Sequence, residues 1–271
     1  MTEISEEHAS GKLLLDRPAE AVARITIRNP SKRNAMDHEI LDGIATLVGK
    51  LDEGISTRCV IIAGSEGMFS AGYDIGDIPD EVFAEEAERL VAHPFSRAIE
   101  AVEAFPFPTL AVLNGHALGG GLELALTCDL RIAARGVKLG MPPAKLGLIY
   151  SHTGLMKFID AVGPARTREL FFTGRNVDAD RGEQIGLVHE VVEADAVDQE
   201  AVALAAEIAG NAPVSLRGNK EMIGRLVGFR RLPEQEEQEA IELRLSSFRT
   251  HDFREGVRAF GEKRKPRWEG R

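Results

Sequence analysis

Two segments of the chain place glycines where a strand would turn into a helix. They are residues 69–74 (FSAGYD) and residues 118–123 (LGGGLE). Glycine lets the backbone come close to a ligand, and free N–H groups at the start of a helix favour an anion. Two such donors that converge on one point form an oxyanion hole, which stabilises an enolate or a tetrahedral anion. A glycine-rich turn of this kind, taken alone, is more often an ordinary loop without a binding role. The prediction of an oxyanion hole therefore depends on the two segments together.

Other chemistries are disfavoured by the same sequence. Neither segment fits the G-x-G-x-x-G dinucleotide pattern or the P-loop pattern, and there is no G-x-S-x-G nucleophile elbow. The formal net charge of -10 argues against a nucleic-acid binder. The two cysteines, Cys59 and Cys128, lie in apolar, strand-like runs, too few for a metal cluster or a disulfide framework. A reducing compartment is therefore the default expectation.

Hydropathy and charge also bear on location. The first ten residues, MTEISEEHAS, are acidic and polar and lack the basic-then-apolar pattern of a signal peptide. The longest mostly apolar stretch, residues 110–134, is interrupted by charged side chains, which excludes a simple transmembrane span. We expect a cytoplasmic protein.

The elements that would position the two segments alternate between strand and helix. Strands are expected within residues 12–28, with a turn at Arg17–Pro18, and at residues 59–63, 109–115 and 130–134. Helices are expected at residues 36–51, 81–104 and 122–126, and the pattern is entirely helical from about residue 196. This alternation predicts an α/β core at residues 1–195 and a helical portion at residues 196–271.

Six motifs in order give a resemblance to a known family. They are NPSKRNAM, FSAGYDI, NGHALGGGLELALTCDLRIA, GMPPAKLGLIY, TGRNVDADRGEQIGLVHEVV and REGVRAFGEKRKPRW. Together they resemble the crotonase (enoyl-CoA hydratase/isomerase) superfamily from about residue 12 to 269. The resemblance implies a β/β/α spiral core, a helical C-terminal trimerisation region, and a homotrimer or dimer of trimers.

The resemblance also implies the substrate and its binding groups. The substrate would be an acyl-CoA thioester, and no metal or redox cofactor is expected because coenzyme A belongs to the substrate. The N–H groups of Tyr73 and Gly120 would hold the thioester oxygen. The remaining implied contacts are with coenzyme A: the loop of Lys32 and Arg33, the backbone of Ala71 and Gly72, and, from a neighbouring subunit, Phe260 and Lys263.

The catalytic pair of the family's hydratases is incomplete in this chain. Those enzymes use two glutamates as base and acid, and Glu123 matches the first. The second position holds Pro143, which cannot exchange a proton; in family isomerases this position carries the base. Tyr150, Ser151 and His152 are the candidates to fill the gap. Each also has an ordinary interpretation, as a packed ring or as a cap of the following helix.

Three functions remain open. An atypical enoyl-CoA hydratase, with Glu123 assisted by Tyr150 or a water, is favoured by family frequency. Decarboxylation of a methylmalonyl-CoA-type thioester is favoured by the residues, because the family's decarboxylases also carry a Tyr at the place of Tyr150 and lack the second glutamate. They have a His, however, where this chain has Tyr73. The third is a non-catalytic or RNA-binding member, disfavoured by the acidic charge.

Overall fold

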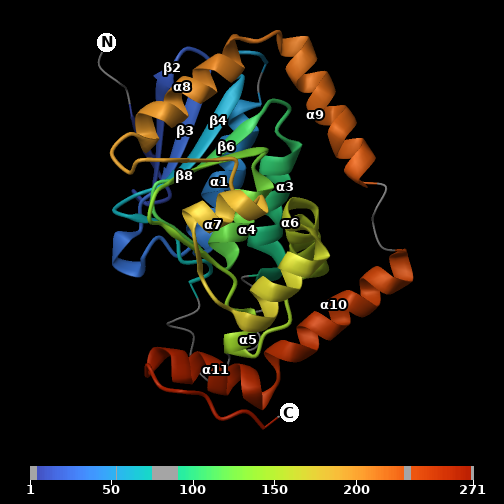
Figure 1. Cartoon of the computed structure of the whole chain (residues 1–271). Coiled ribbons are helices and arrows are strands. Elements are labelled where there is room, and N and C mark those ends of the chain that lie inside the picture. Colours follow the sequence, from blue (N-terminus) through green and yellow to red (C-terminus); the bar gives the residue numbers. More distant parts are fainter. Residues whose placement is uncertain (1–4, 53, 75–90, 229–232, 270–271) are drawn as a thin grey trace.

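The computed structural model describes residues 5–52, 54–74, 91–228 and 233–269. Within these ranges, two β-sheets form the core, and helices pack around them (Figure 1). The larger sheet has the strand order β1-β2-β3-β4-β6-β8-β11. Its strands are β1 (Glu6–His8), β2 (Leu13–Ala19), β3 (Val22–Ile27), β4 (Cys59–Gly64), β6 (Thr109–Leu113), β8 (Leu130–Ala134) and β11 (Glu190–Val192).

The middle of the larger sheet is parallel and buried. Strands β3, β4, β6, β8 and β11 pair in parallel, and all six residues of β4 are buried. Such strands are apolar on both faces because both faces are covered. On one side helix α8 (Val197–Gly210) contacts β4, β6 and β8. The apolar runs that predicted these strands therefore form the core.

The smaller sheet carries the two glycine segments. Its order is β10 (Val177–Asp178), β9 (Lys138–Gly140), β7 (His116–Leu118) and β5 (Met68–Ser70). Strands β5 and β7 are parallel neighbours, with Ser70 opposite Ala117. Because the carboxyl ends of parallel neighbours lie at one edge of a sheet, the two segments that follow these strands meet there.

Helices and helical turns make up the rest of the described chain. Before β11 they are η1 (Pro30–Lys32), α1 (His38–Leu51), η2 (Val91–Phe95), α3 (Ser96–Ala104), α4 (Gly120–Thr127), α5 (Pro143–Leu146), α6 (His152–Thr173) and α7 (Ala179–Ile185). After α8 come α9 (Pro213–Gly228), α10 (Glu234–Phe248) and α11 (His251–Gly261). Helix α9 extends away from the sheets, whereas α10 and α11 turn back beneath the core (Figure 1).

Helix α11 docks closely on α5, the short helix that precedes Tyr150. A side-chain carbon at Gly256 would lie 2.5 Å from the backbone oxygen of Leu146. Helix α10 contacts α6, which follows Tyr150. The C-terminal helices therefore pack against the same corner of the core from which Tyr150 projects.

Most predicted elements are confirmed, with shifted ends. Asp37 caps α1, so this helix starts two residues after the predicted residue 36. The predicted turn at Arg17–Pro18 is wrong: β2 continues to Ala19, and the chain turns at Ala21, whose φ is 56°. Of the predicted helix 81–104, residues 81–90 lie outside the described residues; the remainder is η2 followed by α3. The division of the chain at residue 195 stays a prediction.

Candidate active site

The backbone places two N–H groups at the start of helix α4. Gly120 is the first residue of α4, so its N–H has no partner within the helix. Gly72 has a φ of +100°, and a side-chain carbon there would lie 3.1 Å from the Gly120 nitrogen. Only glycine suits this position, because both its conformation and its closeness to Gly120 exclude a side chain.

A bridge to Met36 orients the second N–H group. The Met36 N–H donates to the Gly72 carbonyl (2.7 Å), and the Asp74 N–H donates to the Met36 carbonyl (3.0 Å). In such a parallel bridge the N–H of the middle residue, Tyr73, points away from the partner strand. This geometry is suited to an oxyanion hole made by Tyr73 and Gly120, the role that the sequence predicts.

Glu123 lies one turn into α4 and is 2% exposed. The hydroxyl of Tyr150 donates a short hydrogen bond to its Oε2 atom. Tyr150 is itself 8% exposed, and its ring packs edge-on against Phe171 at a centroid distance of 5.4 Å. The structure thus brings together the carboxyl group and the tyrosine that the sequence singled out.

Gly154 makes room for this pair. A side-chain carbon at Gly154 would lie 2.5 Å from Cε1 of Tyr150 and 2.8 Å from Oε1 of Glu123. Gly154 also belongs to the capped first turn of α6, where its N–H donates to the Ser151 hydroxyl (3.1 Å). The tight start of α6 therefore holds Tyr150 against Glu123.

Tyr73 places its ring across the same space. A side-chain carbon at Gly120 would lie 2.9 Å from Cε1 of Tyr73, and the ring meets Phe95 edge to face at 4.8 Å. The hydroxyl groups of Tyr73 and Tyr150 interact, and burial raises the pKa of both. The Tyr73 side chain thus reaches from the oxyanion donors to the Tyr150–Glu123 pair.

Burial raises the pKa of Glu123 above its ordinary value. The hydrogen bond from Tyr150 and the charges of Lys157 and Arg244 act in the opposite direction, and the charge of Glu103 adds to the rise. Lys157 and Glu103 also form an ion pair with each other. The net direction favours the protonated form of Glu123 more than in an ordinary glutamate.

The other candidates for the second catalytic group take structural positions. Ser151 caps α6, as its ordinary interpretation holds. His152 points toward α10, where its Nε2 atom lies 3.3 Å from Glu237 Oε1. Pro143 is buried as the first residue of α5. Among the described residues, Tyr150 is therefore the candidate that contacts Glu123.

The residues predicted to bind coenzyme A form two groups. The Ala71 N–H donates to the Arg33 carbonyl (3.0 Å), and Lys32 pairs with Asp74 at 2.8 Å, so these two loops lie together. Phe260, 70% exposed, and Lys263 lie at the end of α11. Their contact with a neighbouring subunit's coenzyme A stays a prediction.

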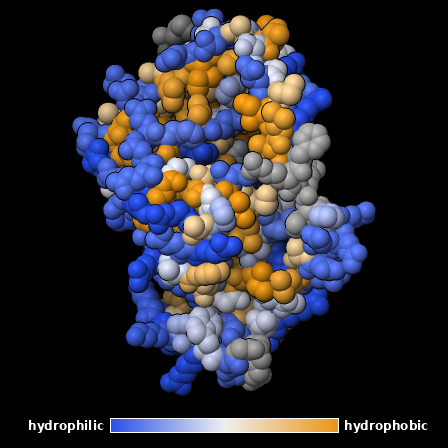
Figure 2. All heavy atoms as spheres, turned by 45° about the vertical axis from the view of Figure 1, so that its right-hand side comes forward, coloured by the Kyte–Doolittle hydropathy of each residue, from blue (hydrophilic) through white to orange (hydrophobic). Residues whose placement is uncertain are grey.

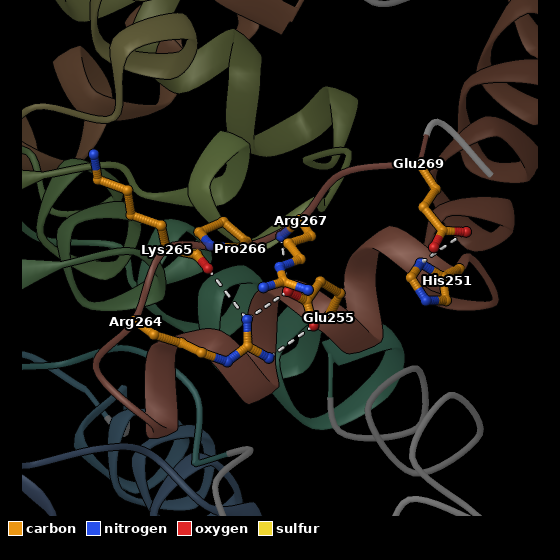
Figure 3. A pocket seen from close by; sticks show the side chains of 7 residues that line it. All are labelled: His251, Glu255, Arg264, Lys265, Pro266, Arg267 and Glu269. Atoms are coloured by element: carbon orange, nitrogen blue, oxygen red, sulfur yellow. Dashed lines mark hydrogen bonds and ion pairs between the residues drawn. The ribbon is translucent and has the colours of Figure 1, made fainter.

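A hollow of about 700 Å³ lies between α11 and the C-terminal tail (Figure 3). The bidentate pair of Arg264 and Glu255 at its centre, with distances of 2.6 and 2.9 Å, ties the tail to α11 and lowers the pKa of Glu255 to about 2. The lining side chains are His251, Glu255, Arg264, Lys265, Pro266, Arg267 and Glu269. None of the predicted catalytic residues lines this hollow, and its internal ion pair gives it a structural role.

Four contributors to the site were not anticipated from the sequence. Gly154 and Phe95 pack against its two tyrosines, and the positive charges of Lys157 and Arg244 lower the pKa of Glu123. Gly154 is three residues past Ser151, inside a capped first turn, which was a usable signal. Arg244 lies 121 positions after Glu123, and only the folding back of α10 brings it near. No local pattern could have indicated that.

The described residues contain no cluster of three or more His, Cys, Asp or Glu side chains that could hold a metal ion. They also contain no helix both long and apolar enough to cross a membrane. The absence of a cofactor stays a prediction.

Comparisons with known proteins identify the family of the chain. Residues 17–271 match the sequence model of the enoyl-CoA hydratase/isomerase family. The chain is 35% identical over 260 residues to "Probable enoyl-CoA hydratase echA8" of Mycobacterium bovis, covering 94% of this chain and 97% of that protein. It is 33% identical over 261 residues to the mitochondrial enoyl-CoA hydratase domain-containing protein 2 of Homo sapiens, covering 94% of this chain and 87% of that protein.

Solved structures share the fold. A methylmalonyl-CoA decarboxylase in complex with 2-nitronate-propionyl-CoA superposes with a TM-score of 0.87 at 26% identity, over 96% of this chain and 99% of that one. An enoyl-CoA hydratase from Bacillus anthracis gives 0.73 at 30% identity, over 96% of this chain and 100% of that one. The chain therefore belongs to the enoyl-CoA hydratase/isomerase family and is an enzyme that acts on an acyl-CoA.

Proposed function

We propose that this enzyme removes carbon dioxide from a 2-carboxyacyl-CoA of the methylmalonyl-CoA type, through an enolate held by the N–H groups of Tyr73 and Gly120. One observation carries the proposal. The carboxyl group of Glu123 is buried and accepts a hydrogen bond from Tyr150, while Pro143 takes the place of a second carboxylate. Such a site can stabilise an anion and donate a proton, but the described residues supply no second carboxylate that pairs with Glu123 as a base.

Decarboxylation needs no base. The bond between C2 and the free carboxylate breaks, its electron pair passes into the thioester, and carbon dioxide leaves. The enolate oxygen is then stabilised by the two backbone N–H groups. A proton delivered by Glu123, which then regains one from solvent, would complete the acyl-CoA product at C2.

Hydration makes a different demand on the same groups. It needs an ionised base that activates water and an acid that protonates the α-carbon. Burial, which raises the pKa of Glu123, opposes the ionised form. Among the described residues, Glu103 is the other carboxylate whose charge acts on Glu123, and it is paired with Lys157. The electrostatics therefore support an acid at this position rather than a base.

The structural comparison supports the same choice. The fold is shared with a methylmalonyl-CoA decarboxylase at a TM-score of 0.87, against 0.73 for the enoyl-CoA hydratase of Bacillus anthracis. The 26% identity to the decarboxylase is lower than the 30% identity to the hydratase. The proposal consequently depends on the site and uses the likeness only as support.

Hydration of an enoyl-CoA is the second candidate. The observation in its favour is Glu123 itself, in a chain 35% identical to a protein named as an enoyl-CoA hydratase. A water held by Tyr150 would then take the place of the second carboxylate. In that case Glu123 would have to lose its proton during turnover.

One paired assay tests the two candidates. Purified enzyme is incubated with methylmalonyl-CoA and, separately, with crotonyl-CoA, and both reactions are followed by mass spectrometry. Decarboxylation predicts loss of carbon dioxide from the first and no change in the second. A gain of water on crotonyl-CoA without loss of carbon dioxide from methylmalonyl-CoA would refute the proposal in favour of hydration.

We also propose a homotrimer or a dimer of trimers in the cytoplasm. Helix α9 has no buried residue and exposes Val214, Met222, Ile223 and Leu226. Figure 2 turns the side that carries α9 forward and shows apolar side chains gathered on this face. An exposed apolar face of this kind supports burial between subunits. Light scattering after gel filtration tests the assembly; a monomer at micromolar concentration would contradict it.

A further inference from the structure

We propose that Arg244, on helix α10, binds the free carboxylate of the acyl group and so selects a 2-carboxyacyl-CoA over the same thioester without that carboxylate. The inference rests on the proposed function for the chemistry of its ligand. It assigns a binding role to a C-terminal helix of the same subunit, a part of the chain outside the two glycine segments.

A hydrogen-bond relay fixes the position of Arg244 beside Tyr150. The Ile149 N–H donates to the Ser247 hydroxyl (3.1 Å), which in turn donates to the Arg244 carbonyl (2.7 Å). Ile149 directly precedes Tyr150 in the chain. The turn of α10 that carries Arg244 is therefore attached to the segment that presents the Tyr150 hydroxyl to Glu123.

The guanidinium group of Arg244 has no acidic partner within the part of the chain that the structure describes. It is half-buried, and its Cζ atom lies 6.0 Å from the centre of the Phe248 ring. Other arginines are paired: Arg24 with Asp16, and Arg264 with Glu255. A half-buried guanidinium has lost part of its hydration, so an incoming carboxylate would regain charge-assisted hydrogen bonds.

Arg244 is also linked to the catalytic groups through aromatic packing and through its charge. Tyr73 packs against the cluster formed by Phe248 and Phe253, and Phe248 is the ring that Arg244 covers. The positive charge of Arg244 lowers the pKa of both Glu123 and Tyr73. The cation therefore lies over the Phe248 ring, in the cluster against which Tyr73 packs, and the Tyr73 ring in turn lies beside the oxyanion donor Gly120.

The planar fork of arginine suits this role. It can bind both oxygens of a carboxylate and so fix the plane of that group. Decarboxylation requires the breaking bond to stand out of the thioester plane, so a fixed carboxylate orients the reaction. An attraction that weakens as charge leaves the carboxylate contributes to binding rather than to the rate of the chemical step. We therefore expect Arg244 to affect affinity and KM more than kcat.

A pair of unreactive ligands isolates the contact. 2-Carboxypropyl-CoA and propyl-CoA are thioethers that cannot decarboxylate and that differ only by the carboxylate. Their affinities are measured by calorimetry for the wild-type enzyme, Arg244→Gln and Arg244→Lys. Arg225→Gln is the matched control, because it removes the same charge from an exposed arginine that pairs with Glu221 on α9.

The carboxylated ligand is expected to bind more tightly to the wild-type enzyme than propyl-CoA does. Arg244→Gln should weaken its binding by about 10- to 100-fold, as expected for hydrogen bonds to a charged group. Propyl-CoA should change by less than about two-fold, and Arg244→Lys should retain part of the preference. Arg225→Gln should leave both affinities unchanged.

Two outcomes would overturn the inference. Equal weakening of both ligands in Arg244→Gln would show that Arg244 only supports the fold, and unchanged affinities for both ligands would show that another group binds the carboxylate. These affinities do not depend on turnover. A failure of the proposed function, seen as no carbon dioxide release, can therefore be told apart from a failure of this inference.

Discussion

The hydroxyl of Tyr150 donates a hydrogen bond to the carboxyl group of Glu123, and both groups are buried. These residues come from different elements, the turn before α6 and the first turns of α4. The hydrogen bond from Tyr150 holds the carboxyl group of Glu123 in place, whereas burial is what raises its pKa. The reactivity of the proposed site depends on this contact together with the oxyanion donors beside it.

Glu123→Gln separates the two candidate reactions. Loss of carbon dioxide needs no proton transfer, and water can protonate the enolate afterwards, so decarboxylation should fall by less than about ten-fold. Hydration depends on proton transfer and should fall by about 100- to 10,000-fold. Initial rates on methylmalonyl-CoA and crotonyl-CoA measure both. If neither rate changes, Glu123 has only a structural role.

The raised pKa of Glu123 links stability to pH. The folded state holds the proton more tightly than the unfolded chain, so the stability that Glu123 contributes is fully present below its unfolded pKa of about 4.5. It is lost as the pH rises through the higher folded pKa. The Glu123→Gln variant lacks this titration. Its free energy of unfolding should therefore rise relative to that of the wild type as the pH is raised from about 4.5 toward 8. Urea unfolding of both proteins at several pH values measures the difference, and a constant gap would contradict a raised pKa.

Gly120 permits a test of the oxyanion donor with its own control. Both Gly120→Ala and Gly120→Pro bring a carbon about 2.9 Å from Cε1 of Tyr73, but only proline removes the N–H. Proline is tolerated at the first position of a helix. We therefore expect Gly120→Pro to lose about a further 100- to 1,000-fold in kcat relative to Gly120→Ala. Equal rates in the two variants would mean that the Gly120 N–H does not contribute.

Gly154→Ala should disturb the Tyr150–Glu123 contact without touching the oxyanion donors. The new carbon would lie 2.5 Å from the Tyr150 ring, and that ring cannot shift freely within its buried surroundings. Turnover is expected to fall by about ten-fold or more, since misplacement by an ångström is costly in catalysis. Gly49→Ala is the control, because nothing lies within 4 Å of a side-chain carbon at this helical position. A variant Gly154→Ala with wild-type kcat would show that the tight fit is not needed.

The Tyr73 ring should limit the length of the acyl group. It lies against Gly120 and Phe95 in the space next to the oxyanion donors. Tyr73→Ala keeps the backbone N–H and empties this space. We expect KM to fall for longer acyl chains relative to short ones, whereas Tyr73→Phe should keep the wild-type order. If KM depends on acyl-chain length in Tyr73→Ala as it does in the wild type, the acyl group does not lie against the Tyr73 ring.

The sequence predicted the site where the chemistry is local. The glycines and the carboxylate one turn later lie in short segments, so their places in the family's motifs were sufficient to single out Gly120 and Glu123 as candidates. Tyr150 was a candidate among three neighbours, because its hydroxyl meets Glu123 only through the packing of α6 on α4. Arg244 comes near the site only because helix α10 folds back over the core, and no periodic pattern in the sequence indicates that contact. The wrong turn at Arg17–Pro18 has a similar cause, since pairing with β3 keeps β2 extended past Pro18.

Reaction with methylmalonyl-CoA in heavy water tests the central claim most directly. If an enolate forms by loss of carbon dioxide, mass spectrometry will show propionyl-CoA that carries one deuterium at C2, together with released carbon dioxide. Crotonyl-CoA in the same buffer should remain unchanged. Intact methylmalonyl-CoA, with hydration of crotonyl-CoA, would contradict the account and show that Glu123 acts as an ionised base despite its burial.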